Sequence, residues 1–389
     1  MMDFTLQQHP ALYAAFDTYP SAKGASTHIY HFSQTLFNHT AGGLLYVLGG
    51  KKLLSYQKEV EVEILRFDAA IPNYLERAQL YSQHLMEVIT TQHQLKICHF
   101  RDIWGGQPIL LLQEEKGYKS VFEVNGLPSI ELPYRYPLLT ESTLKKLRER
   151  EQLCLRKADY IVVPSEVIQS HLRQRGIAAE KITVITNGAD LPQTLEKPVE
   201  APEKYIIYFG ALQSWQGVDT LLKAFRLIGD FSDVKLVICA STKPRKLKEY
   251  FKFIDKQGLS DRIIWQYQLK KRPLYNWISG ALFSVAPLSA CSRNVEQGCS
   301  PLKILESMAL GIPVVASDLP VVREIVSNDR IGKLVRPDRP AELARAMRLL
   351  LDYPDLTKKM GKNAKRHIQE NFTWESKKQQ LIRLYQKAC

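Results

Sequence analysis

The sequence lacks several features that would place it in a simple class. Its six cysteines form no CxxC pair and no regular spacing, so neither a disulfide framework nor a zinc site is predicted, and a reducing compartment is the natural inference. No stretch approaches the roughly eighteen apolar residues of a membrane-spanning helix, and no basic segment followed by an apolar one opens the chain. We therefore expect no transmembrane helix, no signal peptide and a cytoplasmic location.

Two chemical motifs are missing as well. No GxGxxG occurs, which speaks against a dinucleotide-dependent oxidoreductase, although that alternative stays open. No Asp-x-Asp occurs either, so no metal site is predicted. There is also no short repeat and no low-complexity segment.

The totals of the chain indicate a two-domain globular protein with an unusual charge. It has 389 residues, of which 45% are hydrophobic, and a formal net charge of +13. That length favours two domains, and the charge allows nucleic acid, an anionic membrane surface or a polyanionic small molecule as partner, or a bias for solubility alone. Aromatic residues are not interleaved with the basic clusters as in nucleic-acid modules, so no nucleic-acid partner is predicted. Peripheral attachment to the cytoplasmic membrane face stays an expectation, and a non-catalytic basic membrane or nucleic-acid module stays a third alternative.

Apolar runs alternate with helical patterns along both halves of the chain. Residues 191–204 contain three prolines and little apolar content, which is typical of a linker. The predicted fold class is α/β, with two Rossmann-like doubly wound domains facing an interdomain cleft. The predicted organisation is an N-terminal domain over residues 1–190, the linker 191–204, a C-terminal domain over 205–371 and a terminal helix over 372–389 that crosses back to the first domain. Residues 127–137, with three prolines, are predicted to form a long loop.

One stretch, residues 293–324, shows the clearest functional pattern. Ser300 is predicted as a helix N-cap and Pro301 as the first helical residue. The free N–H groups of such a helix start favour an anion. Lys303 in the first turn and Glu306 further along suit a nucleoside diphosphate, with the cation for phosphate and the carboxylate for ribose hydroxyls. The alternative is an ordinary α/β turn whose charged side chains are solvated.

Polar residues also follow predicted strands in the first half. His99, Arg101 and Asp102 come after one strand, and Glu123 and Asn125 end the next. Ligands of open α/β sheets bind beyond such strand ends, so we expect these residues near a reacting sugar or an acceptor. A satisfied structural histidine and a structural cap are the alternatives, and Asp102 fits equally well as a structural partner.

In this order, several motifs resemble those of the family 4 (group 1) glycosyltransferases, which have the two-Rossmann glycosyltransferase-B fold. The matching segments cover most of the chain and are residues 20–28, 158–165, 187–190, 209–222, 298–317 and 372–374. The resemblance implies a retaining, metal-independent transfer of a hexose-type sugar from a nucleoside-diphosphate donor to a hydroxyl of a glycan, a lipid or another acceptor. The donor sugar is then a co-substrate, no other cofactor is expected, and the pathway is that of a cell envelope or polysaccharide.

The resemblance also implies which residues hold the substrates. His99, Arg101 and Lys303 are expected to act in catalysis, and His99, Asp102, Glu123 and Asn125 to bind the acceptor. The expected donor-binding residues are Gly24, Gly210, Gln216, Arg293, Glu296, Gly298, Cys299, Ser300, Pro301, Leu302, Lys303 and Glu306.

Three positions depart from the family pattern. Gly298 stands where a Glu is usual, and Glu296 is the nearest carboxylate. Ala211 and Gln216 stand where an Arg and a Lys usually face the diphosphate. These departures move the predicted phosphate contact to Lys303 and Arg293, and they keep open a divergent or inactive nucleotide-sugar-binding protein.

Overall fold

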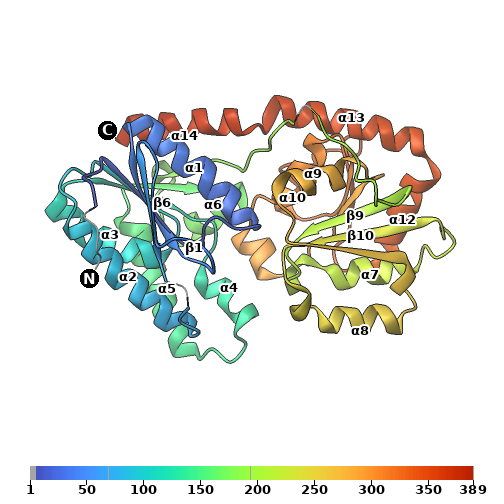
Figure 1. Ribbon diagram of the computed structural model, residues 1–389, viewed down its shortest axis with the longest axis horizontal. Coiled ribbons are helices and arrows are strands. Elements are labelled where there is room, and N and C mark those ends of the chain that lie inside the picture. Colours follow the sequence, from blue (N-terminus) through green and yellow to red (C-terminus); the bar gives the residue numbers. More distant parts are fainter. Residues whose placement is uncertain (1–5, 69, 193, 389) are drawn as a thin grey trace. The chain divides into compact units, whose positions relative to one another are not determined.

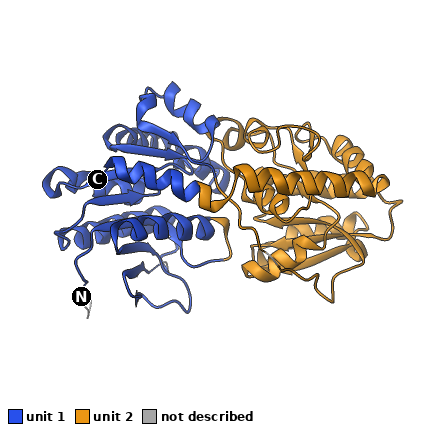
Figure 2. Ribbon diagram, turned by 90° about the horizontal axis from the view of Figure 1, so that it is seen from above, with its two compact units in different colours: residues 1–21, 25–186, 377–389 blue, residues 22–24, 187–376 orange. Residues whose placement is uncertain are grey.

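The computed structural model describes residues 6–68, 70–192 and 194–388. Residues 1–5 and 69 of the predicted first domain, residue 193 of the predicted linker and residue 389 of the predicted terminal helix lie outside the described residues. The chain forms two compact units (Figure 2). Unit 1 takes in residues 1–21, 25–186 and 377–389, and unit 2 takes in residues 22–24 and 187–376. The predicted linker 191–204 therefore falls within unit 2, whereas residues 377–389 of the predicted terminal helix belong to unit 1.

Unit 1 is built on one eight-stranded sheet. Its strand order is β3-β4-β2-β1-β5-β6-β7-β8, and every pairing is parallel except that of β3 with β4. The strands are β1 (Ala11–Thr18), β2 (Gly43–Leu48), β3 (Tyr56–Lys58), β4 (Val62–Phe67), β5 (Ile97–Phe100), β6 (Lys119–Glu123), β7 (Tyr160–Val163) and β8 (Ile182–Val184).

Helices cover both faces of this sheet (Figure 1). The helices of the unit are α1 (Gly24–Thr40), α2 (Tyr74–Thr90), α3 (Ile103–Lys116), α4 (Pro128–Arg135), α5 (Glu141–Lys157), α6 (Glu166–Gln174) and most of α14 (Trp374–Ala388). Because side chains of a strand alternate between faces, Leu12, Ala14 and Phe16 pack against α2 and α3 in one hydrophobic core. Tyr13 points to the opposite face, where α1 and α14 pack.

Unit 2 contains a six-stranded parallel sheet with the order β11-β10-β9-β12-β13-β14. This is the Rossmann strand order. The strands are β9 (Lys204–Gly210), β10 (Val234–Ala240), β11 (Ile263–Tyr267), β12 (Ser284–Ala286), β13 (Val314–Ser317) and β14 (Lys333–Val335). The helices are α7 (Val218–Arg226), α8 (Lys248–Lys256), α9 (Lys271–Ser279), α10 (Leu302–Ala309), α11 (Pro320–Arg323), α12 (Pro340–Asp352) and α13 (Pro354–Asn371).

The central strands of this sheet are buried on both faces, as their continuous apolar runs predict. Ile206 and Tyr208 pack with α7 and α12, whereas Tyr205, Ile207 and Phe209 pack with α9. The predicted fold class, two doubly wound α/β halves, is thus confirmed.

One local prediction is wrong, and one strand was missed. Residues 127–137 are not a continuous loop, because Pro128 begins α4, where its missing N–H costs nothing, and Pro133 is accommodated inside this short helix. The strand β3 was not predicted, because three half-exposed residues at a sheet edge carry little apolar pattern.

None of the helices in the described ranges is long and apolar enough to cross a membrane.

Candidate functional site

The carboxyl end of β9 is the topological switch point of unit 2. From β9 the chain first adds β10 and β11 on one side and then β12, β13 and β14 on the other. Ligands of open α/β sheets bind outside the carboxyl ends of the strands at such a point. The loop there turns at Gly210 (φ 116°) and Gly217 (φ 67°) and includes a short 3₁₀ helix, Ser214–Gln216. A Cβ on Gly217 would lie 1.7 Å from the carbonyl oxygen of Pro287, so only glycine fits this close approach to the end of β12.

Lys303 projects into this loop from the first turn of α10. Its Nζ donates to the hydroxyl of Tyr208 at 3.0 Å and to Oε1 of Gln216, and it lies 4.2 Å from the Tyr208 ring centroid. Neither partner is a carboxylate, so burial lowers the pKa of Lys303 to about 7, with Arg293 adding to the effect and Cys299 opposing it. A cation held by neutral partners is ready to accept an anion.

The start of α10 differs from its prediction. The helix begins at Leu302 with Pro301 at the N-cap position and no side-chain cap. Ser300 is not the cap, because its hydroxyl accepts from the N–H of Asn187 at 3.1 Å, and its carbonyl accepts from the Asn187 amide at 2.6 Å. No side chain therefore caps the first turn of α10, in which the N–H of Ile304 donates to the carbonyl of Pro301 at 3.0 Å.

The structure explains the glycine at position 298. Gly298 follows the π-helical segment Arg293–Gln297 with φ 75° and ψ 178°, a conformation that is essentially restricted to glycine. Glu296 is exposed on that segment, and Arg293 lies with its guanidinium 5.7 Å from the Trp215 ring centroid. A glutamate at position 298 would require a different backbone.

Glu306 lies one turn further along α10 than Lys303. Its Oε1 accepts from the Tyr275 hydroxyl at 3.2 Å. Burial raises the pKa of Glu306 to about 7, against the opposing effects of Lys271 and Tyr275. Like Lys303, Glu306 has fewer charged partners than its burial calls for.

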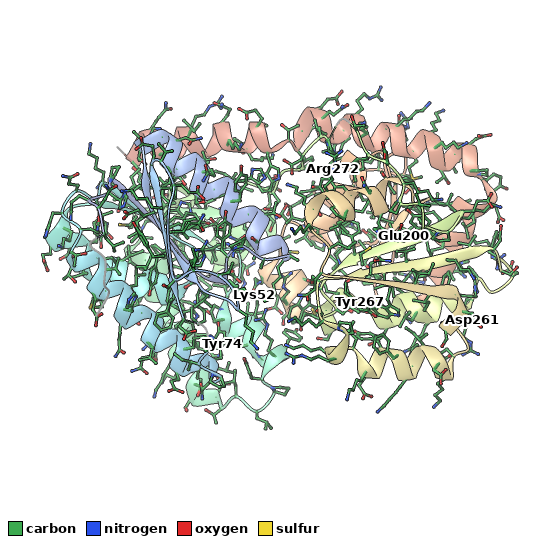
Figure 3. All side chains as sticks on the ribbon, viewed as in Figure 1. Lys52, Tyr74, Glu200, Asp261, Tyr267 and Arg272 are labelled. Carbon is green, nitrogen blue, oxygen red and sulfur yellow. The ribbon has the colours of Figure 1, made fainter. Side chains whose placement is uncertain are left out.

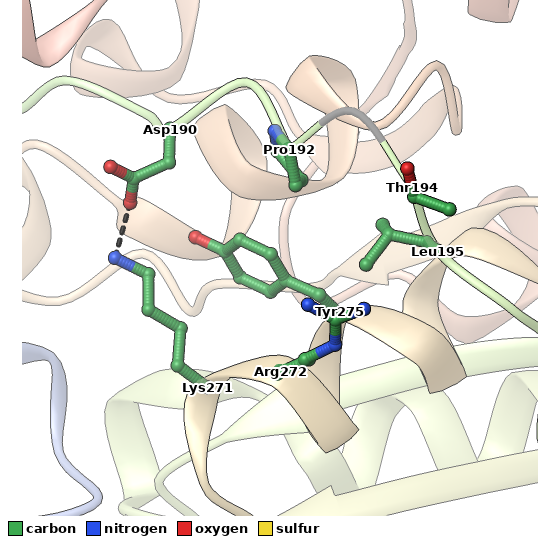
Figure 4. Close-up of a pocket in the computed structure, with 7 residues that line it drawn as sticks. All are labelled: Asp190, Pro192, Thr194, Leu195, Lys271, Arg272 and Tyr275. Atoms are coloured by element: carbon green, nitrogen blue, oxygen red, sulfur yellow. Dashed lines mark ion pairs between the residues drawn. The ribbon is translucent and has the colours of Figure 1, made fainter.

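A pocket of about 480 Å³ opens beside Tyr275 (Figure 4). An ion pair between Lys271 and Asp190 crosses one side of it. Its lining residues are Asp190, Pro192, Thr194, Leu195, Lys271, Arg272 and Tyr275. Tyr275 therefore connects an open pocket on one side with Glu306 on the other.

In unit 1 the switch point lies between β1 and β5, and a buried carboxylate, Glu123 at the end of β6, lies close to it. One oxygen of Glu123 is 2.9 Å from His28 Nε2 and accepts from Arg101 Nε at 2.9 Å. The other accepts from the Tyr13 hydroxyl at 2.7 Å and lies 3.1 Å from His99 Nε2. Burial alone would raise the pKa of Glu123, but these donors outweigh it and hold the pKa well below its usual range.

The ionised Glu123 fixes the state of His99. A carboxylate only accepts, so His99 Nε2 carries the proton. Burial lowers the pKa of His99, which leaves Nδ1 as an acceptor for the Tyr385 hydroxyl of α14 at 2.8 Å. His99 and Glu123 are 0% and 1% exposed, so neither has surface for a ligand. Their predicted contacts with the reacting sugar or acceptor are corrected to a positioning role.

Arg101 links this buried cluster to a side chain at the protein surface. Its side chain is 10% exposed and pairs with Asp17 at the end of β1, whose side chain is 40% exposed. The carboxylate of Asp102 caps α3 by accepting from the N–H groups of Trp104 and Gly105, and it also accepts from that of Phe16, which matches the alternative of a structural partner. The amide of Asn125 donates to Glu123.

The comparisons with known proteins point to one family. Residues 193–367 match the family model described as glycosyl transferases group 1, and residues 22–193 match that of glycosyltransferase family 4. The chain belongs to the group 1 glycosyltransferases. The resemblance predicted from its motifs is thereby confirmed.

The similarity to individual members of this glycosyltransferase family is moderate. An MMP alpha-(1->4)-mannosyltransferase of Mycolicibacterium hassiacum is 28% identical over 231 residues, which cover 59% of this chain and 54% of the relative. The chain thus spans about half the length of that relative.

Solved structures of such transferases match over nearly the whole chain. A sucrose-phosphate synthase of Thermosynechococcus elongatus is 20% identical with a TM-score of 0.79 and covers 98% of this chain and 99% of its own. HepE of Anabaena, solved with UDP-glucose, is 19% identical with a TM-score of 0.75 and covers 97% and 100%. At such identities these matches establish the glycosyltransferase-B fold.

Within this glycosyltransferase, the structure brings together only part of the predicted site. Gly210, Gln216 and Lys303 converge, and Arg293 and Cys299 act on the Lys303 charge. Gly24 begins α1. Sequence reasoning missed five polar residues, namely Asp17, Tyr208, Tyr275, Lys271 and Tyr385. Tyr208 and Asp17 lie at strand ends, which is the one signal that could have indicated them.

Proposed function

We propose that this chain is a retaining glycosyltransferase that moves a hexose-type sugar from a nucleoside diphosphate to a hydroxyl acceptor without a metal ion. The observation that carries the proposal is Lys303, a half-buried lysine whose Nζ has two neutral partners at the switch point of unit 2. Beside it, α10 begins with uncapped N–H groups. Both features favour a diphosphate.

We assign the parts of the donor from the positions of side chains along and beside α10. We assign the diphosphate to Lys303, Arg293 and the first N–H groups of α10. Glu306 then accepts from the ribose hydroxyls, and the base occupies the adjacent pocket, which Tyr275 lines while it donates to Glu306. A solved neighbour bound to UDP-glucose supports a nucleotide sugar as the donor.

The chemistry requires stabilisation of negative charge on the leaving group. The bond between the sugar C1 and the diphosphate oxygen breaks, the acceptor oxygen bonds to C1, and the acceptor proton leaves with the diphosphate or to solvent. Lys303 and the N–H groups of α10 face the charge that develops on the diphosphate. They would supply the stabilisation that a metal supplies elsewhere.

A binding measurement tests the donor site. Thermal shift with UDP, GDP, ADP and their glucose conjugates should show stabilisation by at least one nucleotide. In Glu306→Gln the affinity should fall roughly ten- to hundredfold, because a charge-assisted hydrogen bond is lost. Glu249→Gln on α8, an exposed carboxylate paired with Lys252, is the matched control. Unchanged affinity in Glu306→Gln would sink the proposal.

A protein that binds nucleotide sugars without transferring them is the second candidate. It is favoured by Ala211 and Gln216, which stand where the family usually has cations. Release of nucleoside diphosphate from the donor that binds, with an acceptor panel and in the presence of EDTA, distinguishes the two. Binding without release would favour the second candidate, and release abolished by EDTA would overturn metal independence.

The acceptor and the location remain proposals of the same kind. We place the acceptor, a glycan or a lipid-linked hydroxyl, at the carboxyl edge of the unit 1 sheet and the protein in the cytoplasm, attached peripherally to anionic lipid. Flotation with neutral and with anionic vesicles tests the attachment, since equal recovery with both would exclude an electrostatic contact.

A further inference from the structure

The most exposed part of the polar cluster in unit 1 lies beside its switch point. Asp17 is the next-to-last residue of β1 and Arg101 directly follows β5, and these two adjacent parallel strands flank the switch point. Ligands of this fold bind outside the carboxyl ends of such strands. The two side chains form an ion pair, of which Asp17 is the more exposed member. The pair therefore presents both a hydrogen-bond acceptor and a donor where a ligand is expected.

The positive charge of Arg101 is balanced by carboxylates. Arg101 bonds to two carboxylates, Asp17 and Glu123. Asp102 lies near as a third carboxylate, and the guanidinium of Arg77 lies 5.8 Å from the ring centroid of Phe16, which precedes Asp17. Two further arginines lie in this region, Arg66, whose Nε donates to the carbonyl of Tyr19, and Arg135, which is exposed on α4. Arg101 thus has no surplus positive charge for a phosphate or carboxylate ligand.

Aromatic rings adjoin the same strand end. Tyr74 packs edge-on against Phe16 at 5.5 Å and accepts from Trp104 Nε1 at 3.2 Å. The ring centroid of Tyr136 lies 5.8 Å from that of Tyr74, and Tyr136 is 42% exposed. Figure 3 shows Tyr74 among the side chains of unit 1. Burial raises the pKa of Tyr74, and the Asp102 and Asp17 carboxylates add to this, which places its hydroxyl within their field.

We propose that this edge of unit 1 binds an uncharged, hydroxyl-bearing ring of the acceptor. Asp17 accepts from one ring hydroxyl, Arg101 donates to a neighbouring one, and Tyr136 covers an apolar face of the ring. A neighbouring donor and acceptor match the two hydroxyls of a vicinal diol, each of which can donate and accept. A phosphate ester would instead meet the carboxylate of Asp17.

The buried cluster beneath the pair holds it in place. Glu123 accepts a hydrogen bond from Nε of Arg101 and so fixes its side chain. Tyr13 and His99, whose stacked rings have centroids 4.8 Å apart, both contact the other oxygen of Glu123. Arg101 can thus turn little when a ligand binds, so recognition depends on Asp17, the more exposed member of the pair.

The inference rests on the proposed function, because it concerns the acceptor of that transfer, but it can be tested without a donor. Saturation-transfer NMR would use the whole protein with four neutral probes, methyl α-D-glucoside, methyl α-D-mannoside, methyl α-D-galactoside and myo-inositol, and with glucose 6-phosphate and mannose 6-phosphate. We expect contact signals from at least one neutral probe and weaker signals from the phosphates.

Variants assign those signals to this edge. Asp17→Asn should reduce the neutral signal at least fivefold, and Tyr136→Ala at least twofold, whereas Arg135→Gln should leave it unchanged. Asp230→Asn, in an exposed Asp–Arg pair with Arg348 of unit 2, is the matched control. Thermal melts of each variant report folding, and Tyr136 is exposed enough that its variant keeps the native fold.

Several outcomes would overturn the inference. They are the absence of contact from all neutral probes, a signal unaffected by Asp17→Asn and Tyr136→Ala, or tighter binding of a phosphate that Arg135→Gln abolishes. Nucleotide binding measured on the same samples separates the two proposals. Nucleotide binding without neutral-probe contact refutes this inference alone, and the reverse refutes the proposed donor site alone.

Discussion

The two units share a strand order around their switch points but treat buried charge in opposite ways. In unit 1, Glu123 receives hydrogen bonds from Tyr13, Arg101 and Asn125 and lies beside two histidines, so it stays ionised. In unit 2, Lys303 and Glu306 are held by neutral partners, and burial moves the pKa of each to about 7.

The buried carboxylate of unit 1 thus has charged hydrogen-bond partners, whereas Lys303 and Glu306 of unit 2 have neutral ones. A buried charge that is fully hydrogen-bonded stabilises its surroundings, whereas one with too few partners costs stability until a ligand supplies them. The hydrogen bonds of the Glu123 cluster are thus satisfied within the protein, whereas Lys303 and Glu306 have neutral partners, and the proposed donor site rests on this contrast. The predictions below would break or sharpen this contrast.

The largest effect is expected at Glu123. Glu123→Gln should lower the free energy of unfolding by about 3–5 kcal/mol, because Arg101 loses its buried counter-charge. Urea unfolding measures the change, and Glu149→Gln on the exposed face of α5 should stay within about 0.5 kcal/mol of the wild type. A similar small change in Glu123→Gln would contradict the view of a completed cluster.

Lys303 should behave in the opposite way. Lys303→Met removes a poorly compensated charge, so the free energy of unfolding should stay equal or rise slightly. Nucleotide affinity should nevertheless fall roughly ten- to hundredfold. Calorimetric titration and urea unfolding measure the two quantities, with Lys252→Met on α8 as the exposed control. A destabilised Lys303→Met protein would show that Lys303 is structural.

The pH dependence of stability should show both groups of unit 2. From about pH 4.5 to 7 the folded protein keeps a proton on Glu306 that the unfolded chain has released, so this group lowers stability as pH rises. From about pH 7 to 10.5 the unfolded chain keeps a proton that Lys303 has lost, so stability rises with pH.

Each contribution has a slope of at most about 1.4 kcal/mol per pH unit. Urea unfolding of wild type, Glu306→Gln and Lys303→Met between about pH 5 and 9 measures them by difference, because other groups cancel. Glu306→Gln should flatten the fall below about pH 7 and Lys303→Met the rise above it. Parallel curves for all three proteins would contradict the assigned shifts.

The smallest effect is expected at Tyr385. Tyr385→Phe leaves Nδ1 of His99 without its donor and should cost about 1–2 kcal/mol of unfolding free energy. The nitrogen chemical shifts of His99 should still report a proton on Nε2, because Glu123 holds it. Tyr353→Phe, at an exposed tyrosine of unit 2, should change nothing.

The sequence predicted the scaffold better than the site. Buried parallel strands such as residues 11–16 and 205–209 are recognisable because apolar runs between turn signals have few alternatives. Pro128 and Pro133 suggested a loop, since proline breaks helices in general, but Pro128 lies where helices tolerate it best. The assignment of Ser300 as a cap failed because a residue 113 positions away, Asn187, takes its hydroxyl.

The donor motif could be predicted from the sequence better than the roles of the polar residues at the strand ends. Lys303 was recognisable from its place at a helix start, whereas its partners Tyr208 and Gln216 come from a separate strand and loop. His99 looked reactive in sequence because nothing there shows that Tyr385, 286 positions away, covers it. The role of a polar residue depends on its burial and on partners far away in the sequence, and neither can be inferred from the residues next to it in the chain.

The two places where the chain enters and leaves unit 2 are joined to each other. The N–H of Ala189 donates to the carbonyl of Phe372 at 2.8 Å, the N–H of Trp374 donates to that of Ala189 at 3.3 Å, and a Cβ on Gly188 would collide with the Trp374 backbone. Residues 187–376 are therefore an insertion with adjacent ends, which is the arrangement that tolerates transplantation. With the donor and acceptor sites as proposed, exchanging this segment between relatives at residues 187 and 376 would create chimaeras that combine one protein's donor choice with another's acceptor choice.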